Sequence, residues 1–231
     1  MLKKAIRKPH HLPHYVYWKI KPVLIQSYFT LKLGVKTFKF QGRIYHYFCH
    51  KYNTSWKNER AVEVPIVWEK VKNCHGKILE VGNVLSHYHS VTHDVLDKYE
   101  KAKHVINQDV VDFHPTERYD MIVSISTIEH IGWDEIPKEP RKVLHAIKNL
   151  KSNCLAPKGI MIITAPLGHN PELDRTLKQG NTDLGKQCYL KRLTKENLWK
   201  ESDLDDVQNV KYDSPFPNAN AIVITINDSS K

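Results

Sequence analysis

Acidic side chains follow a series of short apolar segments in the middle of the chain, at Glu80, Asp97 and Asp109. The first of these segments, residues 78–81, breaks at Gly82. A short apolar run that ends in glycine is typical of a buried parallel strand that turns at a nucleotide-type site. A carboxylate at the end of the next strand can accept hydrogen bonds from both ribose hydroxyls, and a later one can accept from an adenine amino group. The order of these residues predicts a site for an adenosine-containing ligand.

The glycine turn itself argues against a dinucleotide. A dinucleotide fingerprint reads G-x-G-x-x-G, and its second glycine lets the backbone approach a pyrophosphate. The corresponding positions here are Gly82, Val84 and His87, so only the first glycine is present. S-adenosylmethionine contains adenosine but no phosphate, which relaxes that requirement. The turn therefore favours S-adenosylmethionine over NAD or FAD.

The elements that must position these residues form a strand–helix pattern. Apolar residues at helical spacing predict helices over 59–74 and 141–150. Short apolar segments predict parallel strands over 77–81, 92–96, 105–107, 120–124 and 159–164. Because the carboxyl ends of parallel strands meet at one edge of a sheet, the acidic residues should converge there.

Three expectations concern the segment that follows the fifth strand. The prolines and glycines of residues 165–190 predict a loop or lid. Residues 194–200 should form a short helix with Thr194 as its N-cap. Residues 207–212 and 221–226 should form a closing antiparallel pair.

The charge is distributed unevenly along the chain. Residues 1–60 hold 13 Lys and Arg against one acid, whereas the remaining residues hold 22 Lys and Arg against 24 acids. We therefore divide the chain into a basic, aromatic extension over 1–58 and a near-neutral domain over 59–231. Within the extension, residues 38–40 and 44–48 predict a β-hairpin around Gln41-Gly42, and Pro22 should limit any helix over 15–28. Such an extension favours an anionic partner, such as a membrane surface, an acidic glycan or a nucleic acid.

The cysteines and the apolar residues bound the compartment. The four cysteines are scattered and form no CxxC pair, so we expect neither disulfides nor a cysteine zinc site. No apolar run is long enough to cross a bilayer, and no signal peptide is expected. A cytoplasmic protein, peripheral at the inner membrane surface, fits these features.

Over residues 75–165 the ordered segments LEVGNVLSHY, HDVLDKYE, INQDVVDF and STIEHIGWDE resemble class I S-adenosylmethionine-dependent methyltransferases. The resemblance implies a Rossmann-like α/β fold, with a seven-stranded sheet, helices on both faces, and the cofactor across the carboxyl ends of strands one to four. The cofactor-binding residues it implies are Glu80, Gly82, Asn83, Asp97, Asp109, Val110 and Ser126. Two of them have rivals, Asp94 for Asp97 and Asp112 for Asp109, and Glu80 could instead cap a helix.

Transfer of a methyl group to a hydroxyl of a second molecule, the acceptor, requires a group that removes the proton of that hydroxyl. His130 and Asp134 follow the fourth strand and are the candidate bases, while His169 and Asp174 are candidates for contacts with substrate. A second group of histidines, at 87, 89 and 93, lacks the fourth ligand of a closed metal site, so no metal is predicted.

The same segments resemble a subgroup of these enzymes associated with surface-polysaccharide and glycan assembly. That resemblance favours a sugar hydroxyl of a saccharide, polysaccharide or glycolipid as the methyl acceptor. One alternative is a nucleic-acid (RNA) methyltransferase, although Ser-Thr-Ile-Glu stands where an amino-methylating enzyme would carry an NPPY-type tetrapeptide. A second alternative is a non-catalytic binding module, which the reduced glycine loop favours.

Overall fold

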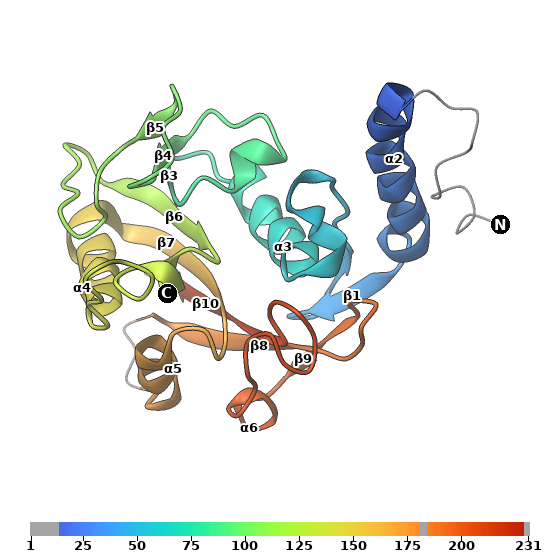
Figure 1. The fold of residues 1–231 in the computed structure, drawn as a ribbon. Coiled ribbons are helices and arrows are strands. Elements are labelled where there is room, and N and C mark those ends of the chain that lie inside the picture. Colours follow the sequence, from blue (N-terminus) through green and yellow to red (C-terminus); the bar gives the residue numbers. More distant parts are fainter. Residues whose placement is uncertain (1–13, 181–183, 229–231) are drawn as a thin grey trace.

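The computed structural model describes residues 14–180 and 184–228 and places one large mixed sheet at the centre of the chain (Figure 1). The eight strands run in the order β5-β4-β3-β6-β7-β10-β8-β9. Their bounds are β3 Ile78–Val81, β4 Asp94–Leu96, β5 Val105–Ile106, β6 Tyr119–Ile125, β7 Leu155–Pro166, β8 Lys186–Arg192, β9 Trp199–Ser202 and β10 Ala221–Asp228. The predicted Rossmann-like α/β class is confirmed, and β9 adds an eighth strand at the edge.

The strand order reverses between β3 and β6. From β3 the chain moves outward through β4 to β5, and it then returns to the other side of β3 to form β6 and β7. These five strands are parallel. In open α/β sheets a ligand binds outside the carboxyl ends of the strands at such a reversal. The fold therefore places a candidate site beyond Val81 and Ile125.

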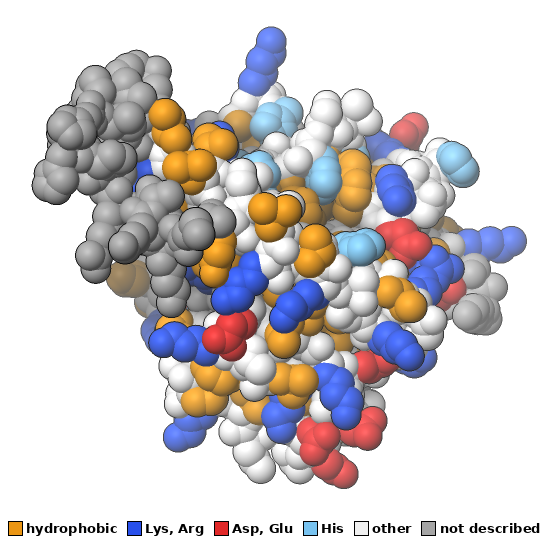
Figure 2. Space-filling model, turned by 90° about the vertical axis from the view of Figure 1, so that its right-hand side faces the viewer, with side chains coloured by type: hydrophobic (Ala, Val, Ile, Leu, Met, Phe, Trp, Pro, Cys, Tyr) orange, Lys and Arg blue, Asp and Glu red, His pale blue; other side chains and the backbone are white. Residues whose placement is uncertain are grey.

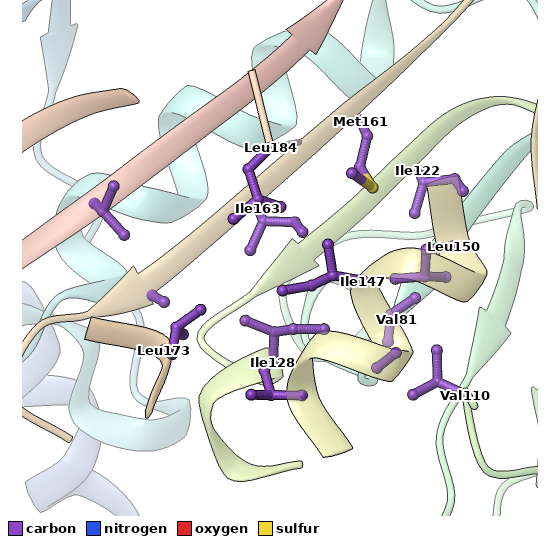
Figure 3. Close-up of a cluster of buried hydrophobic side chains, with 14 of the residues drawn as sticks. Val81, Val110, Ile122, Ile128, Ile147, Leu150, Met161, Ile163, Leu173 and Leu184 are labelled. Carbon is purple, nitrogen blue, oxygen red and sulfur yellow. The ribbon is translucent and has the colours of Figure 1, made fainter. Parts of the chain in front are cut away.

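One face of the sheet is covered by α4 (Lys142–Asn149) and α5 (Pro171–Lys178). Figure 3 shows Ile147 and Leu150, at the end of α4, packed beside Ile122 and Ile163 from the central strands. These side chains are almost wholly buried, and removing one such side chain costs about 2–5 kcal/mol. This packing is the rigid support beneath the carboxyl ends of β3 and β6.

The opposite face is covered by α3 (Arg60–Lys72) and by a hairpin of β1 (Thr37–Phe40) and β2 (Arg43–His46). The predicted helix over 59–74 and the hairpin around Gln41-Gly42 are both confirmed. The hydroxyl of Tyr47, which follows β2, accepts a hydrogen bond of 2.7 Å from the amide of Trp199. The hairpin is thereby joined to edge strand β9.

The N-terminal helix α2 spans His14–Phe29 and continues into η1 (Thr30–Gly34). The prediction that Pro22 would limit a helix here is wrong, since one proline removes a single backbone hydrogen bond and the helix continues through it. The ring of Phe29 stacks on Trp56 of η2 (Tyr52–Lys57), with 5.1 Å between centroids. Among the described residues, none of the helices combines the length and apolar character needed to cross a bilayer. Residues 1–13 of the predicted extension lie outside the described residues.

The segment predicted as a loop or lid over 165–190 contains α5 and most of β8, so that prediction is wrong for these residues. The side chain of Asn170 caps α5 by accepting hydrogen bonds from the amides of Glu172 and Leu173. Leu173 and Leu177 bury the inner face of the helix. The prolines and glycines of this segment therefore mark the ends of elements and do not indicate a long loop.

The last part of the chain corrects two more predictions. Residues 194–198 form the turn between β8 and β9, so the predicted helix over 194–200 is absent, and Thr194 accepts a hydrogen bond from the amide of Leu198. Residues 207–212 do not form a strand, because Val207 ends the short helix α6 (Leu204–Val207). The predicted strand over 221–226 is confirmed, but it pairs with β7 and β8.

Candidate functional site

A cavity of about 570 Å³ lies at the carboxyl ends of the parallel strands, beside the reversal of strand order. Four successive segments of the chain form its wall, one after each of β3, β4, β5 and β6. Its lining residues are Val81, Gly82, Leu96, Asp97, Lys98, Tyr99, Gln108, Asp109, Val110, Thr127, His130, Ile131, Asp134 and Glu135.

Gly82 ends β3 at a point where only glycine fits. Its φ of +86° lies in the left-handed region, and a Cβ at this position would collide with the side chain of Thr127. The amide of Gly82 donates a hydrogen bond of 2.8 Å to the carbonyl of Leu96. The glycine thus lets the ends of β3, β4 and β6 approach one another around the cavity.

Asp97 stands at the wall of the cavity just after β4. One oxygen of its carboxylate accepts hydrogen bonds of 2.8 Å from the amides of Tyr99 and Glu100, and the other accepts from the amide of Asn83 at 3.3 Å. Asn83 does not itself line the cavity, and its side chain donates to Glu100. The carboxylate is therefore held in place from two loops, and the contribution of Asn83 is to position it.

Asp109 lines the far end of the cavity within a network of four charges. Its Oδ2 accepts hydrogen bonds from Lys142 at 2.6 Å and from Lys98 at 2.9 Å, and both lysines also contact Glu135. Burial alone would raise the pKa of Asp109, but the two ammonium groups outweigh it, so that this pKa is lowered. Hydrogen bonding to Asp109 raises the pKa of Lys98. The neighbouring Val110 adds an apolar wall.

Like Asn83, two more of the predicted cofactor residues, Glu80 and Ser126, lie away from the cavity wall. Glu80 is fully buried and accepts hydrogen bonds from the amides of Val84 and Leu85, while its second oxygen lies 2.8 Å from His93 Nε2. Successive strand residues point to opposite faces, which is why Val81 reaches the cavity and Glu80 does not. The Glu80 carboxylate caps the turn, which is the alternative that the sequence leaves open.

Ser126 is the second of these residues. Its hydroxyl donates a hydrogen bond of 2.6 Å to Glu63 Oε1, and its φ is +36°. The carbonyl of Ser126 accepts from Arg60, whose guanidinium also pairs with Glu63 at 2.6 Å. Ser126 therefore anchors the end of β6 to the start of α3, on the face of the sheet away from α4.

The two candidate catalytic residues lie together on the remaining side of the cavity. His130, the last residue of η4 (Ile128–His130), has its Nδ1 2.5 Å from Asp134 Oδ2. His169, which follows β7, places its Nε2 3.8 Å from the same oxygen, and its ring meets His130 edge-on at 4.7 Å between centroids. Burial lowers the pKa of His169. The fold thus joins residues that lie about forty positions apart in the chain.

The other candidates are not brought to this site. Asp174 accepts a hydrogen bond from the amide of Gly168 and lines a different hollow, between α5 and α6. The three histidines at 87, 89 and 93, for which no metal site is predicted, have separate partners. His87 stacks on Tyr52, His89 stacks on Trp68 and His93 contacts Glu80.

A buried cluster of four ionisable residues, Glu59, Arg60, Glu63 and Glu129, lies next to this site. The sequence analysis does not predict it. Glu129 is 1% exposed, and its carboxylate has no hydrogen-bond partner among the described residues. Its Oε1 lies 3.5 Å from His130 Nε2, an ion-pair distance without hydrogen-bond geometry. Burial raises the pKa of Glu129. Helical spacing could have indicated Glu63, because that residue falls among the apolar positions of α3.

Comparisons with known proteins give similar structures only. No family model matches the chain, and no curated protein matches it. One similar solved structure is the N-methyltransferase NodS from Bradyrhizobium japonicum with S-adenosyl-L-homocysteine, at 12% identity and a TM-score of 0.43, covering 73% of this chain and 85% of that one. Another is the 1,6-didemethyltoxoflavin N1-methyltransferase from Burkholderia thailandensis, at 13% identity and a TM-score of 0.44, covering 96% and 92%. Likeness at this level does not assign a function, which must come from the residues of this chain.

Proposed function

We propose that this protein is a methyltransferase that uses S-adenosylmethionine. The observation that supports it most is the position of Asp97, whose anchored carboxylate stands at the wall of a cavity at the reversal of strand order. A carboxylate there suits the two hydroxyls of a ribose. The single glycine turn at Gly82 provides no cradle for a pyrophosphate, which favours a cofactor without phosphate.

The residues at the cavity fit the parts of this cofactor. Asp97 would accept hydrogen bonds from the ribose hydroxyls, and the methionine portion would lie along Gly82, which lines the same cavity. The apolar side chains of Leu96, Val110 and Ile131 offer surfaces for a planar base. Bound there, the cofactor supplies a methyl group activated by its sulfonium. Glu80, Asn83 and Ser126 support these contacts by fixing the turns that present them.

We further propose that the acceptor is a hydroxyl of a saccharide or glycolipid and that it binds on the side of His130 and Asp134. The support is the resemblance of residues 75–165 to enzymes associated with glycan assembly, together with the His130 imidazole and the Asp134 carboxylate that border the cavity. Such groups bind hydroxyls, and they activate an oxygen nucleophile by removing its proton.

Calorimetry with S-adenosylmethionine tests the cofactor. The wild-type chain should bind it, and Asp97→Ala should weaken binding by more than about tenfold, because a pair of charge-assisted hydrogen bonds is lost. Asp112→Ala is the matched control, since Asp112 is an exposed carboxylate near the same strands and outside the cavity lining. Absence of binding by the wild-type protein, or equal binding by Asp97→Ala, would contradict the proposal.

Transfer of a labelled methyl group tests the acceptor. Simple glycosides and glycolipid headgroups should accept label, whereas structured RNA and small primary amines should not. Label appearing only in RNA would favour the nucleic-acid alternative, and label appearing only in the amine would favour an N-methyltransferase. A protein that binds cofactor and methylates none of these classes would point to a binding module.

We also propose that the protein is cytoplasmic and lies at an anionic membrane surface. Helix α2 and the residues after it expose apolar side chains, with Leu31 70% and Val35 64% exposed. A groove beside them is lined by four lysines, 32, 36, 57 and 195, against one acid, Glu196. Figure 2 shows hydrophobic and basic side chains interspersed over this side of the molecule. Apolar and basic groups side by side suit the boundary of anionic headgroups.

A further inference from the structure

Three potential metal ligands converge beside the cofactor cavity. One ligand atom from each of His130, Asp134 and His169 lies within 4.8 Å of the other two. They come from η4, from the turn that follows it and from the segment after β7, so each stands on backbone fixed by the sheet. Two imidazoles and one carboxylate on one side of a metal are the donor set of open divalent sites.

We propose that His130, Asp134 and His169 bind one divalent cation of the Mn²⁺ or Zn²⁺ class. Asp134 lies between the two imidazoles, with Oδ2 2.5 Å from His130 and 3.8 Å from His169. Metal–ligand bonds of about 2.0–2.2 Å require ligand atoms roughly 3 Å apart. The two contacts of Asp134 bracket the required separation, and the ligand atoms of the two histidines lie within 4.8 Å of each other. Rotations of the half-exposed His130 and Asp134 side chains would bring all three atoms to one cation.

The surrounding charge favours a cation at this point. The two nitrogens of the His130 ring face different carboxylates, Asp134 at Nδ1 and Glu129 at Nε2. Glu129 is buried and has no hydrogen-bond partner among the described residues, so its burial is not compensated by a donor. A cation at the neighbouring site would give this buried carboxylate a charge partner that it otherwise lacks.

The position of the site gives the cation a use. His130 and Asp134 belong to the wall of the cavity, and three protein ligands leave coordination positions open for an oxygen. A hydroxyl bound to a divalent cation has a lowered pKa, so its proton leaves to solvent at neutral pH. This use rests on the proposed methyltransferase function, whereas binding of the cation does not. Under this inference His130 and Asp134 act on the acceptor through the cation that they bind, and the acceptor is an oxygen compound.

Metal binding by the full chain is the test. Protein freed of metal with a chelator is titrated with Mn²⁺, followed by electron paramagnetic resonance, and with Zn²⁺, followed by calorimetry. We expect one equivalent to bind, and we expect His169→Ala and Asp134→Asn each to weaken binding by more than about tenfold. The matched control is His145→Ala, since His145 is an exposed histidine on α4.

Circular dichroism of each variant establishes that it is folded, and Asp134→Asn, at a half-exposed position, preserves the shape of the side chain. The inference is overturned if the wild-type chain binds neither ion, or if both site variants bind as tightly as His145→Ala does. S-adenosylmethionine binding is measured on the same metal-free samples. Cofactor binding without metal binding rejects the cation alone, and metal binding without cofactor binding rejects the proposed function alone.

Discussion

Thr127 occupies the space that a Cβ at residue 82 would need, so the carboxyl ends of β3 and β6 meet only because residue 82 is glycine. The two strands are neighbours at the reversal of strand order, and both residues line the cavity. The left-handed φ of Gly82 adds a second reason for glycine, because a Cβ there is strained whatever the available space. The contact between these residues links the first glycine of the motif to the segment that carries Glu129 and His130.

Gly82→Ala should therefore both destabilise the fold and abolish binding of S-adenosylmethionine. Gly42→Ala is the matched control, because Gly42 also has a left-handed φ, of +74°, but nothing lies within 4 Å of its Cβ position. In the control the free energy of unfolding should fall only by the cost of the left-handed conformation, about 1–2 kcal/mol. For Gly82→Ala the free energy of unfolding should fall further, because the collision with Thr127 is added. Urea unfolding and calorimetry measure the two effects, and equal destabilisation by both substitutions would show that Thr127 does not limit residue 82.

Asp109→Asn should make the free energy of unfolding less dependent on pH. The pKa of Asp109 is lowered in the fold, so its stabilising effect is complete above the unfolded value of about 3.9 and is lost as the pH falls through the folded pKa. At pH 7 the variant should be about 1–3 kcal/mol less stable than the wild type, and the difference should shrink toward pH 3. Urea unfolding at several pH values measures it. Asp112→Asn, at an exposed position, should show no such trend, and a difference for Asp109→Asn that stays constant with pH would refute the argument.

Arg60→Met should destabilise the protein by about 3–5 kcal/mol, because it leaves Glu63 charged and buried without its partner. The pair is joined at 2.6 Å and is almost completely buried. Arg43→Met is the control, since Arg43 forms an ion pair of the same length with Glu69 but is 61% exposed, and it should cost less than about 1 kcal/mol. Adding Glu63→Gln to Arg60→Met should recover part of the loss. Chemical denaturation measures all three, and similar effects of Arg60→Met and Arg43→Met would contradict a structural role for the buried pair.

Lys32→Glu combined with Lys36→Glu should reduce binding to vesicles that contain phosphatidylserine, because each lysine near an anionic surface contributes about 1 kcal/mol. Binding by the wild type should fall as salt is raised. The charge-matched control is Lys101→Glu with Lys103→Glu, two exposed lysines that precede β5, on the side of the molecule away from α2 (Figure 1). Cosedimentation measures each protein. Equal loss in both double variants would indicate a general effect of net charge, and binding to neutral vesicles alone would exclude an electrostatic surface.

Local sequence patterns were sufficient for most of the sheet. The helix at 59–74 and the strand over 120–124 can be predicted from the residues of each segment alone, because burial on one or both faces dictates the residue types there. The failures lie where the same residues serve two purposes. Proline and glycine between 165 and 190 predict a loop, yet Pro171 begins α5 after its Asn170 cap and Gly185 precedes β8.

The motif that ends in Gly82 predicts a ligand site at the end of β3 and favours a cofactor without phosphate, and Gly82 and Asp97 both line the cavity found there. It did not separate residues that face the cavity from those that support it. Glu80 and Val81 are neighbours in the chain, but the pleat of the strand sends them to opposite faces.

The sequence by itself determined the α/β class, the order of the strand ends and the identity of the glycine turn, because these depend on the residue types of contiguous segments. Only the tertiary structure decided which polar side chains from distant parts of the chain meet. Asp109 meets Lys142, Ser126 meets Glu63, and His130 meets His169 across gaps of 33, 63 and 39 positions. Contacts of this kind follow from the packing of α3, α4 and the loop after β7 against the sheet, and no local pattern encodes that packing.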